Sequence, residues 1–203
     1  MTDFFALLNV PRRPWLDPES LKQRFLALSA DFHPDRIHGD ESQKRAAQDR
    51  YTQLNAAYTC LRNPRERLSH LIELERGEKP SELQNVPADL MTLFLEIGDS
   101  CRRVDQFLSE KSAATSPLLK VQFFQRGQEL SDHLALIRDR LNASRDSLIA
   151  SVQRLDREWD PMSSTNPSSR SDLLNQLQEL RRLLGFFDRW LSQVQERLVQ
   201  LVL

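Results

Sequence analysis

The 203-residue sequence has little of what marks an enzyme or a metalloprotein. It contains only five glycines and has no glycine-rich phosphate loop, no Ser-His-Asp elbow, and no cysteine or histidine pair at metal-ligand spacing. His38, His70 and His133 are isolated in sequence. Such histidines more often lie on the surface, or have their hydrogen bonds satisfied within the protein, than bind a metal ion. The sequence therefore predicts no catalytic residue, no metal site and no cofactor.

The net charge and the lack of long hydrophobic runs argue against two further classes of protein, nucleic-acid-binding proteins and membrane proteins. The formal net charge is -1, whereas a nucleic-acid-binding protein normally carries a basic face. No apolar run approaches the roughly 18 residues that span a bilayer, and the N-terminus lacks the pattern of a signal peptide. Cys60 and Cys101 lie on separate predicted helices and suit reduced core residues better than a disulfide. We expect a soluble cytoplasmic protein that binds neither nucleic acid nor membrane.

A polar stretch at residues 31–36, with the sequence Asp-Phe-His-Pro-Asp-Arg, separates two helical patterns. Apolar residues recur at helical spacing before it, at Leu21, Phe25, Leu28 and Phe32, and after it, at Ala47, Tyr51, Leu54, Tyr58 and Leu61. Pro34 biases His33 away from helical dihedrals. Two such stripes bury each other by folding into an antiparallel helical hairpin, which places His33, Pro34 and Asp35 at an exposed tip.

Capping signals predict the limits of the N-terminal helices. A short first helix runs from about Asp3 to Asn9, Asp17-Pro18 begins the second, and Asp40 begins the third. Asn63-Pro64 with Glu66 has the form of a capping box and begins a fourth. Gly77 and Pro80 then interrupt the helical pattern. The predicted division is residues 1–76, a connector at 77–86, and a C-terminal part at 87–203.

Sustained heptads follow the connector. One stripe runs from Leu90 to Leu108, a second follows Ser116-Pro117 and continues to about Asp160, and a third runs from Leu173 to Leu201. A loop rich in Ser, Pro and Asn lies between the second and third stripes, at residues 161–171. Three such stripes predict an antiparallel three-helix bundle, so the whole chain is expected to be all-α.

The hairpin resembles the J domain, the module by which J proteins stimulate DnaK-class chaperone ATPases. His-Pro-Asp alone also fits an ordinary turn, but here it lies between a helix carrying Lys22 and Arg24 and a helix containing Leu54-Asn55-Ala56-Ala57-Tyr58. The resemblance covers about residues 1–76. It implies that the tip contacts a chaperone.

Most of the chain is similar to HscB, the J-domain co-chaperone of iron–sulfur cluster biogenesis. Three local stretches carry this similarity: residues 61–67 (LRNPRER), 90–97 (LMTLFLEI) and 184–189 (LGFFDR). HscB proteins bring the scaffold protein IscU to the chaperone HscA and stimulate its ATP hydrolysis. The similarity implies the same partners for this chain.

Two sets of binding residues follow from this resemblance. The chaperone-binding set comprises His33, Pro34, Asp35, Arg36, Lys22 and Arg24. The scaffold-binding set comprises Met91, Leu95, Glu96, Asp99 and Phe186. The heptads leave Met91, Leu95 and Phe186 off the stripes through Leu90, Phe94, Ile97, Leu184 and Phe187, so we expect these three to form an exposed apolar patch.

Departures from the family pattern keep other functions open. Ala30 and Asp31 stand where J domains usually carry a further cation, which weakens the expected chaperone contact. The hairpin between Cys101 and Phe186 is longer than the family norm. One alternative is a general J-domain protein with another client. The other is a structural coiled-coil protein that self-associates, for example as a homodimer.

Overall fold

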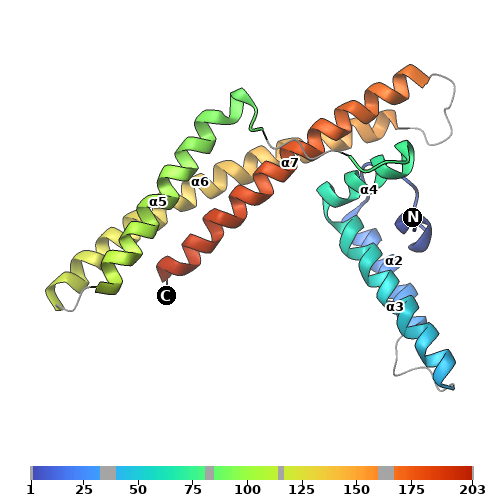
Figure 1. Cartoon of the computed structure of the whole chain (residues 1–203), viewed down its shortest axis with the longest axis horizontal. Helices are drawn as coiled ribbons and strands as arrows, with labels where there is room; N and C mark the ends of the chain where they lie inside the picture. Colours follow the sequence, from blue (N-terminus) through green and yellow to red (C-terminus); the bar gives the residue numbers. More distant parts are fainter. Residues whose placement is uncertain (1, 33–39, 81–84, 114–116, 160–166, 203) are drawn as a thin grey trace. The chain divides into compact units, whose positions relative to one another are not determined.

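Helices make up the regular structure of the described residues. The computed structural model describes residues 2–32, 40–80, 85–113, 117–159 and 167–202, without the side chains of 117–121, 167 and 168. Within these ranges every regular element is a helix, as the sequence predicts (Figure 1). The chain forms two compact units: the first comprises Met1–Glu82 and Ile149–Arg182, and the second comprises Leu83–Leu148 and Leu183–Leu203.

The N-terminal helices begin at the predicted caps. They are α1 (Phe4–Leu7), α2 (Pro18–Asp31), α3 (Glu41–Arg62) and α4 (Pro64–Arg76). The Asp17 carboxylate accepts a hydrogen bond from Ser20 N at 2.8 Å. Hydrogen bonding by the Ser20 side chain, together with this backbone bond, lowers the pKa of Asp17. Asp40 accepts from Gln43 N at 2.8 Å while the Gln43 side chain accepts from Asp40 N at 3.3 Å, which completes a capping box.

The fourth helix is capped at both ends. Asn63 accepts hydrogen bonds from Arg65 N at 2.9 Å and Glu66 N at 3.2 Å, so the predicted cap is confirmed. The Glu66 carboxylate pairs instead with the Arg65 guanidinium at 3.3 Å, because a charged partner competes with the cap backbone for it. Gly77 ends α4 with φ +76°, a left-handed conformation that glycine adopts without a Cβ clash.

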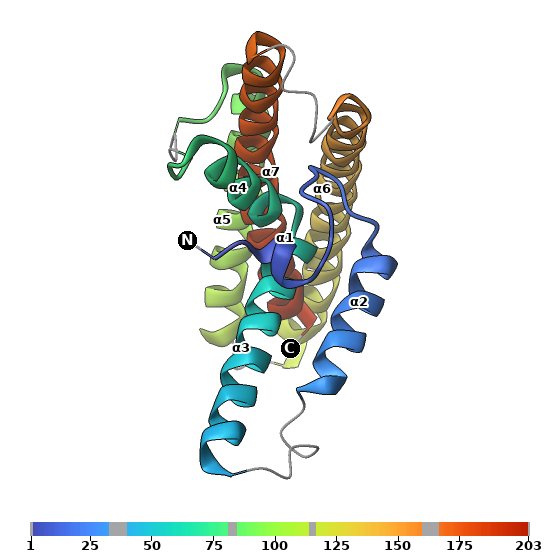
Figure 2. The same cartoon turned by 90° about the vertical axis from the view of Figure 1, so that its right-hand side faces the viewer.

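The predicted helical hairpin is present. Helices α2 and α3 lie side by side (Figure 2). Leu21 of α2 is 2% exposed, and Leu54 of α3 is fully buried. Phe25 stacks on Tyr58 across the pair, with ring centroids 4.4 Å apart. The two apolar stripes therefore bury each other as the sequence predicts.

The first unit also includes the ends of two long helices, α6 (Pro117–Glu158) and α7 (Pro167–Val202). The Asp156 carboxylate accepts hydrogen bonds from Arg13 Nε at 3.2 Å and Trp15 N at 3.0 Å, and the Trp159 indole donates to the Arg12 carbonyl at 2.8 Å. These bonds fix the segment before α2 against the end of α6.

A second group of contacts joins α4 to α7. The Arg170 guanidinium lies 3.3 Å from the centre of the Trp159 ring and forms an ion pair with Glu75 at 2.8 Å. Arg76 Nη2 donates to the Asn175 side chain at 2.7 Å. The Arg170 and Glu75 side chains are both partly shielded from water, so this ion pair stabilises the protein more than a fully exposed pair would.

The boundaries of the two compact units differ from those of the predicted domains, which were residues 1–76, a connector at 77–86, and residues 87–203. The domain division stays a prediction. Helix α5 (Met91–Ala113) has 23 residues whereas α6 has 42, about 63 Å of helix. The last part of α6 therefore extends past the length that α5 can cover. Its apolar residues Val152 and Leu155, and Trp159 directly after its end, are buried in the first unit.

Arg67 is a buried cation within the first unit. It is 2% exposed, and its guanidinium donates to the carbonyls of Pro14 and Leu61, both at 2.8 Å. The guanidinium also lies 5.4 Å from the centre of the Trp15 ring. Burial lowers the pKa of Arg67 to about 10. This arginine therefore fixes the segment around Pro14 onto α3 and α4.

His70 lies between the first and fourth helices. Phe4 N donates a hydrogen bond to His70 Nε2 at 3.0 Å, and the imidazole stacks on Phe4 with centroids 4.6 Å apart. Because Nε2 accepts, the folded protein requires the neutral ring. Burial lowers the pKa of His70, and the Arg12 charge acts in the same direction, whereas the charges of Asp3 and Glu73 raise it.

Acidification should therefore destabilise the protein through His70. A histidine whose pKa is lower in the folded state contributes full stability above its unfolded pKa, about 6.5, and loses it as the pH falls toward the folded value. We expect the free energy of unfolding in urea to decrease below about pH 6.5. His70→Gln, which keeps an acceptor but does not titrate, should show a smaller decrease; an identical pH dependence would contradict this assignment.

The core of the second unit is built from three helices. Figure 1 shows α5, α6 and α7 in succession, each reversing the direction of the one before. The buried residues come from all three: Ile97, Cys101 and Val104 from α5; Leu134, Ile137 and Leu141 from α6; and Phe186, Phe187, Trp190, Val194 and Leu198 from α7. A short 3₁₀ turn (Ala88–Leu90) precedes α5. The predicted antiparallel three-helix bundle is confirmed.

The cysteines and the apolar character of the helices bear on two expectations from the sequence. Cys60 and Cys101 are both free, as predicted, and burial raises the pKa of the Cys60 thiol to about 11. None of the helices in the described ranges combines the length and the apolar character needed to cross a membrane.

Candidate functional site

The His-Pro-Asp tip is bounded by two well-defined helix ends. His33, Pro34, Asp35 and Arg36 lie outside the described residues. On one side, α2 ends where Phe32 N donates to the Ser29 carbonyl at 3.2 Å, and the Arg50 guanidinium lies 5.9 Å from the Phe32 ring centre. On the other side, the Asp40 capping box begins α3. The two helices thus fix both ends of the segment that carries the motif.

The basic residues predicted to contact a chaperone lie on the surface of α2. Lys22 and Arg24 are both exposed. Leu26, one helical turn after Lys22, is 54% exposed and adds an apolar group to the same face. The exposure of Leu26 was not predicted from the sequence. Its position outside the stripe of Leu21 and Phe25 does indicate an exposed side chain.

An exposed apolar patch lies on the first turns of α5. Met91 is 41% exposed and Leu95 is 60% exposed, as expected from their positions off the heptad stripe. Phe94 is 42% exposed. Phe94 and Leu95 follow Met91 by three and four residues, so all three side chains lie on the same side of the helix. The prediction that Phe94 belongs to the core was wrong: its ring is tilted against that of Trp190, with centroids 6.3 Å apart, and much of the side chain stays in water.

The two predicted acidic residues of this helix already have basic partners. Glu96 forms a double hydrogen bond with Arg140 of α6, at 2.7 and 3.0 Å, and this pairing raises the pKa of Arg140. Asp99 pairs with Arg103 at 2.7 Å and with Arg102 at 3.5 Å. The exposed pairs of Asp99 can exchange for a partner's cations at small cost, since exposed ion pairs contribute about 1 kcal/mol or less.

Phe186 does not belong to the exposed patch. It is 3% exposed and lies in the core of the second unit, with its ring 5.8 Å from that of Trp190 and the Arg189 guanidinium 5.0 Å from its centre. The prediction of a free Phe186 was wrong. A heptad stripe describes a helix with one partner, whereas α7 has two, and its buried face is wide enough for both Phe186 and Phe187.

The histidines of the described ranges have structural partners. His70 accepts from Phe4 N, and His133 Nε2 lies 3.1 Å from Ser100 Oγ. The Ser100 hydroxyl also bonds the Glu96 carbonyl at 2.9 Å, which leaves it to accept from His133. A serine that accepts from its histidine is not activated as a nucleophile. Within the described part of the chain, no three His, Cys, Asp or Glu residues gather as a metal site.

Comparison with known proteins supports the two resemblances at different levels. The DnaJ domain family matches residues 3–70. The chaperone HscB from Vibrio cholerae has a similar structure, with TM-score 0.54 and 18% identity over 93% of this chain and 96% of that one. The human co-chaperone protein HscB has TM-score 0.58 and 17% identity, covering 98% of this chain and 81% of the human one.

These matches assign the fold along the whole chain. The hairpin formed by α2 and α3 lies inside the matched residues 3–70, and the helical remainder is included in both structural alignments. The predicted resemblance to HscB is therefore confirmed for the fold. This chain begins with a DnaJ domain and has the all-helical fold of the HscB co-chaperones.

Proposed function

We propose that this protein is a J-domain co-chaperone of the HscB type. It would stimulate the ATPase of a DnaK/HscA-class chaperone and deliver to it an iron–sulfur scaffold protein of the IscU type, promoting cluster transfer. The observation that carries this proposal is the combination of a DnaJ domain at residues 3–70 with an HscB-like fold over nearly the whole chain. The protein itself would act by binding and not by catalysis.

The chaperone contact is assigned to the tip and to α2. Asp35 offers a carboxylate to a chaperone arginine, and Pro34 restricts the loop so that less conformational freedom is lost on binding. Arg36 precedes the Asp40 cap and adds a cation near the motif. The exposed Lys22 and Arg24 supply electrostatic steering toward an acidic chaperone surface.

The scaffold contact is assigned to the exposed face of α5. Met91, Phe94 and Leu95 supply an apolar centre, and Glu96 and Asp99 form a polar rim. This is the usual arrangement of a protein interface, in which a few central apolar residues carry most of the binding energy. Because Phe186 is buried, the proposed contact is limited to α5.

Removing the centre of this patch should abolish scaffold binding without unfolding the protein. Met91→Ala combined with Leu95→Ala deletes two side chains that are 41% and 60% exposed, so we expect an unchanged helix content. Affinity for an IscU-type scaffold should fall by a factor of about 30 or more, since central interface residues cost about 2 kcal/mol or more when truncated. Isothermal titration calorimetry measures this change.

Leu136→Ala is the matched control for this variant. Leu136 is 66% exposed on α6, so its truncation removes similar apolar surface outside the patch. The control should retain wild-type scaffold affinity. A folded double variant with undiminished affinity would show that α5 does not bind the scaffold, and stimulation of the chaperone without scaffold should persist in both variants.

Recovery of partners from a lysate with ATP present distinguishes the proposed function from its alternatives. Joint recovery of an IscU-type scaffold and a DnaK-class ATPase supports the HscB-type function. Recovery of the ATPase with an unrelated client would indicate a general J-domain protein. Recovery of neither, together with a stable homodimer in gel filtration, would indicate a structural self-associating protein.

A further inference from the structure

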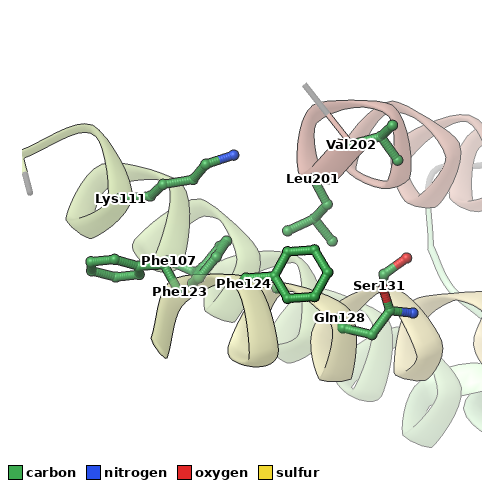
Figure 3. A pocket seen from close by; sticks show the side chains of 9 residues that line it. Phe107, Lys111, Phe123, Phe124, Gln128, Ser131, Leu201 and Val202 are labelled. Atoms are coloured by element: carbon green, nitrogen blue, oxygen red, sulfur yellow. The ribbon is translucent and has the colours of Figure 1, made fainter. Parts of the chain in front are cut away.

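A cleft with no role in the proposed function lies in the second unit, where the end of α5, the first turns of α6 and the end of α7 meet (Figure 3). Its volume is about 550 Å³, within the range of small-molecule sites in proteins. The residues lining it are Phe107, Lys111, Phe123, Phe124, Gly127, Gln128, Ser131, Leu201 and Val202.

The walls of this cleft are mainly apolar and expose large side chains. Phe124 is 76% exposed and Val202 is 83% exposed, while Leu201 faces them from α7 (Figure 3). Phe107 forms the floor at 1% exposure and meets Phe123 edge to face, with centroids 5.8 Å apart. Hydrophobic surface of this kind, in a hollow and not on a flat face, is typical of a ligand site.

Gly127 keeps the floor of the cleft in place. A Cβ on this residue would lie 3.2 Å from Phe107 Cζ, closer than ordinary van der Waals contact. Glycine inside a helix costs about 1 kcal/mol relative to alanine. The close approach of the Phe107 ring explains why a glycine stands at residue 127. The apolar floor therefore depends on the absence of a side chain at residue 127.

One end of the cleft carries a positive charge. Lys111 is exposed, and its side chain extends from α5 toward the opening in Figure 3. The described lining residues include no carboxylate. Glu110, next to Lys111 in the sequence, forms an ion pair with Arg126. Gln128 and Ser131 are the remaining polar groups of the lining, and both come from α6.

We propose that this cleft binds an amphipathic monoanion, a carboxylate with a linear hydrocarbon tail. The carboxylate pairs with the Lys111 ammonium, and the tail lies over Phe107 and Phe124 toward Leu201. Lys111, the cation among the described lining residues, lies beside a hollow lined by aromatic and aliphatic groups, and this matches the charge and shape of such a ligand. The Arg126 guanidinium lies 5.6 Å from the centre of the Phe107 ring, but it is already paired with Glu110. A second copy of the chain would instead require a broad apolar face.

This site is independent of the proposed scaffold contact. Lys111 follows Leu95 by sixteen residues on the same helix, which corresponds to about 24 Å. Loss of chaperone or scaffold binding would therefore leave the cleft unaffected, and the two proposals can fail separately.

Calorimetric titration of the full chain with laurate, below its micelle concentration, tests the proposal. Lauryl alcohol and laurylamine carry the same tail with a neutral and a cationic head. We expect laurate to bind about fivefold more tightly than the alcohol, because an exposed ion pair contributes up to about that factor. The amine should bind more weakly than the alcohol.

Two variants separate the head-group contact from the tail contact. Lys111→Gln should reduce laurate affinity about fivefold and leave the alcohol unaffected. Phe124→Ala should weaken both ligands about tenfold because it removes an apolar wall. Arg102→Gln on α5 and Leu136→Ala on α6 are matched controls outside the cleft, and both should bind laurate like the wild type. Circular dichroism verifies the fold of every variant.

Several results would overturn the proposal. One is the absence of laurate binding by the wild type, and another is equal affinity for laurate and laurylamine. Laurate affinity that is undiminished in folded Phe124→Ala would place the ligand elsewhere. Concentration-dependent dimerisation lost in Phe124→Ala would assign the cleft to self-association. Sedimentation with phosphatidylglycerol vesicles without binding of free laurate would assign it to a membrane surface.

Discussion

Replacing His33 with glutamine is expected to reduce the chaperone's ATPase to its unstimulated rate. The sequence places His33 in the polar segment between α2 and α3, where the His-Pro-Asp motif of the DnaJ domain lies. Substitutions away from caps and cores change the free energy of unfolding by about 0.5 kcal/mol or less. The variant should therefore keep its helix content and its melting temperature. Single-turnover ATP hydrolysis by a DnaK/HscA-class chaperone measures the loss.

His38→Gln provides the matched control, because His38 belongs to the same interhelical segment but not to the motif. It should retain full stimulation. If His33→Gln stimulates as well as the wild type, the segment does not act as a J-domain tip. If it unfolds, His33 has a structural role and its binding role would need another variant.

Phe186→Ala is expected to destabilise the second unit by about 3–5 kcal/mol, the usual cost of removing a buried aromatic side chain. The ring is 3% exposed and contacts Trp190 and the Arg189 guanidinium, so its removal leaves a cavity in the centre of the helical core. Urea denaturation followed by circular dichroism gives the free energy of unfolding. Scaffold affinity measured well below the denaturation midpoint should remain close to that of the wild type.

Phe94→Ala is the matched comparison, since it removes the same side chain from a position that is 42% exposed. Its cost should be about 1.5 kcal/mol or less, because half of the ring is already in water. Equal destabilisation by the two substitutions would contradict the assignment of Phe186 to the core. A strong loss of scaffold affinity in folded Phe186→Ala would restore it to the binding surface.

Local chemistry made the helix limits predictable. Asp17, Asp40 and Asn63 cap the helices that the sequence assigned to them, because an Asx side chain followed by Pro, or by Gln at the third position, satisfies free amide groups within a few residues. The left-handed Gly77 ends α4 for an equally local reason. The location of the His-Pro-Asp motif between two amphipathic stripes required no tertiary information either.

Long-range contacts were not predictable in this way. Heptad spacing places Phe186 and Phe94 relative to a single stripe, but the exposure of a side chain depends on how many neighbours its helix has. Asp156 and Arg67 show no distinguishing local pattern, and they become important only because the fold brings Arg13, Trp15 and Pro14 beside them.

The sequence by itself determined the all-α class, the helix limits and the position of the His-Pro-Asp motif, because each depends on residues close together in the chain. Only the tertiary structure decided that the end of α6 and the beginning of α7 join the N-terminal helices in one compact unit. It also decided that Phe94 and not Phe186 reaches the surface. The physical reason is that burial is shared among helices distant in sequence. A periodic pattern records that a face is buried but does not identify the partner that buries it.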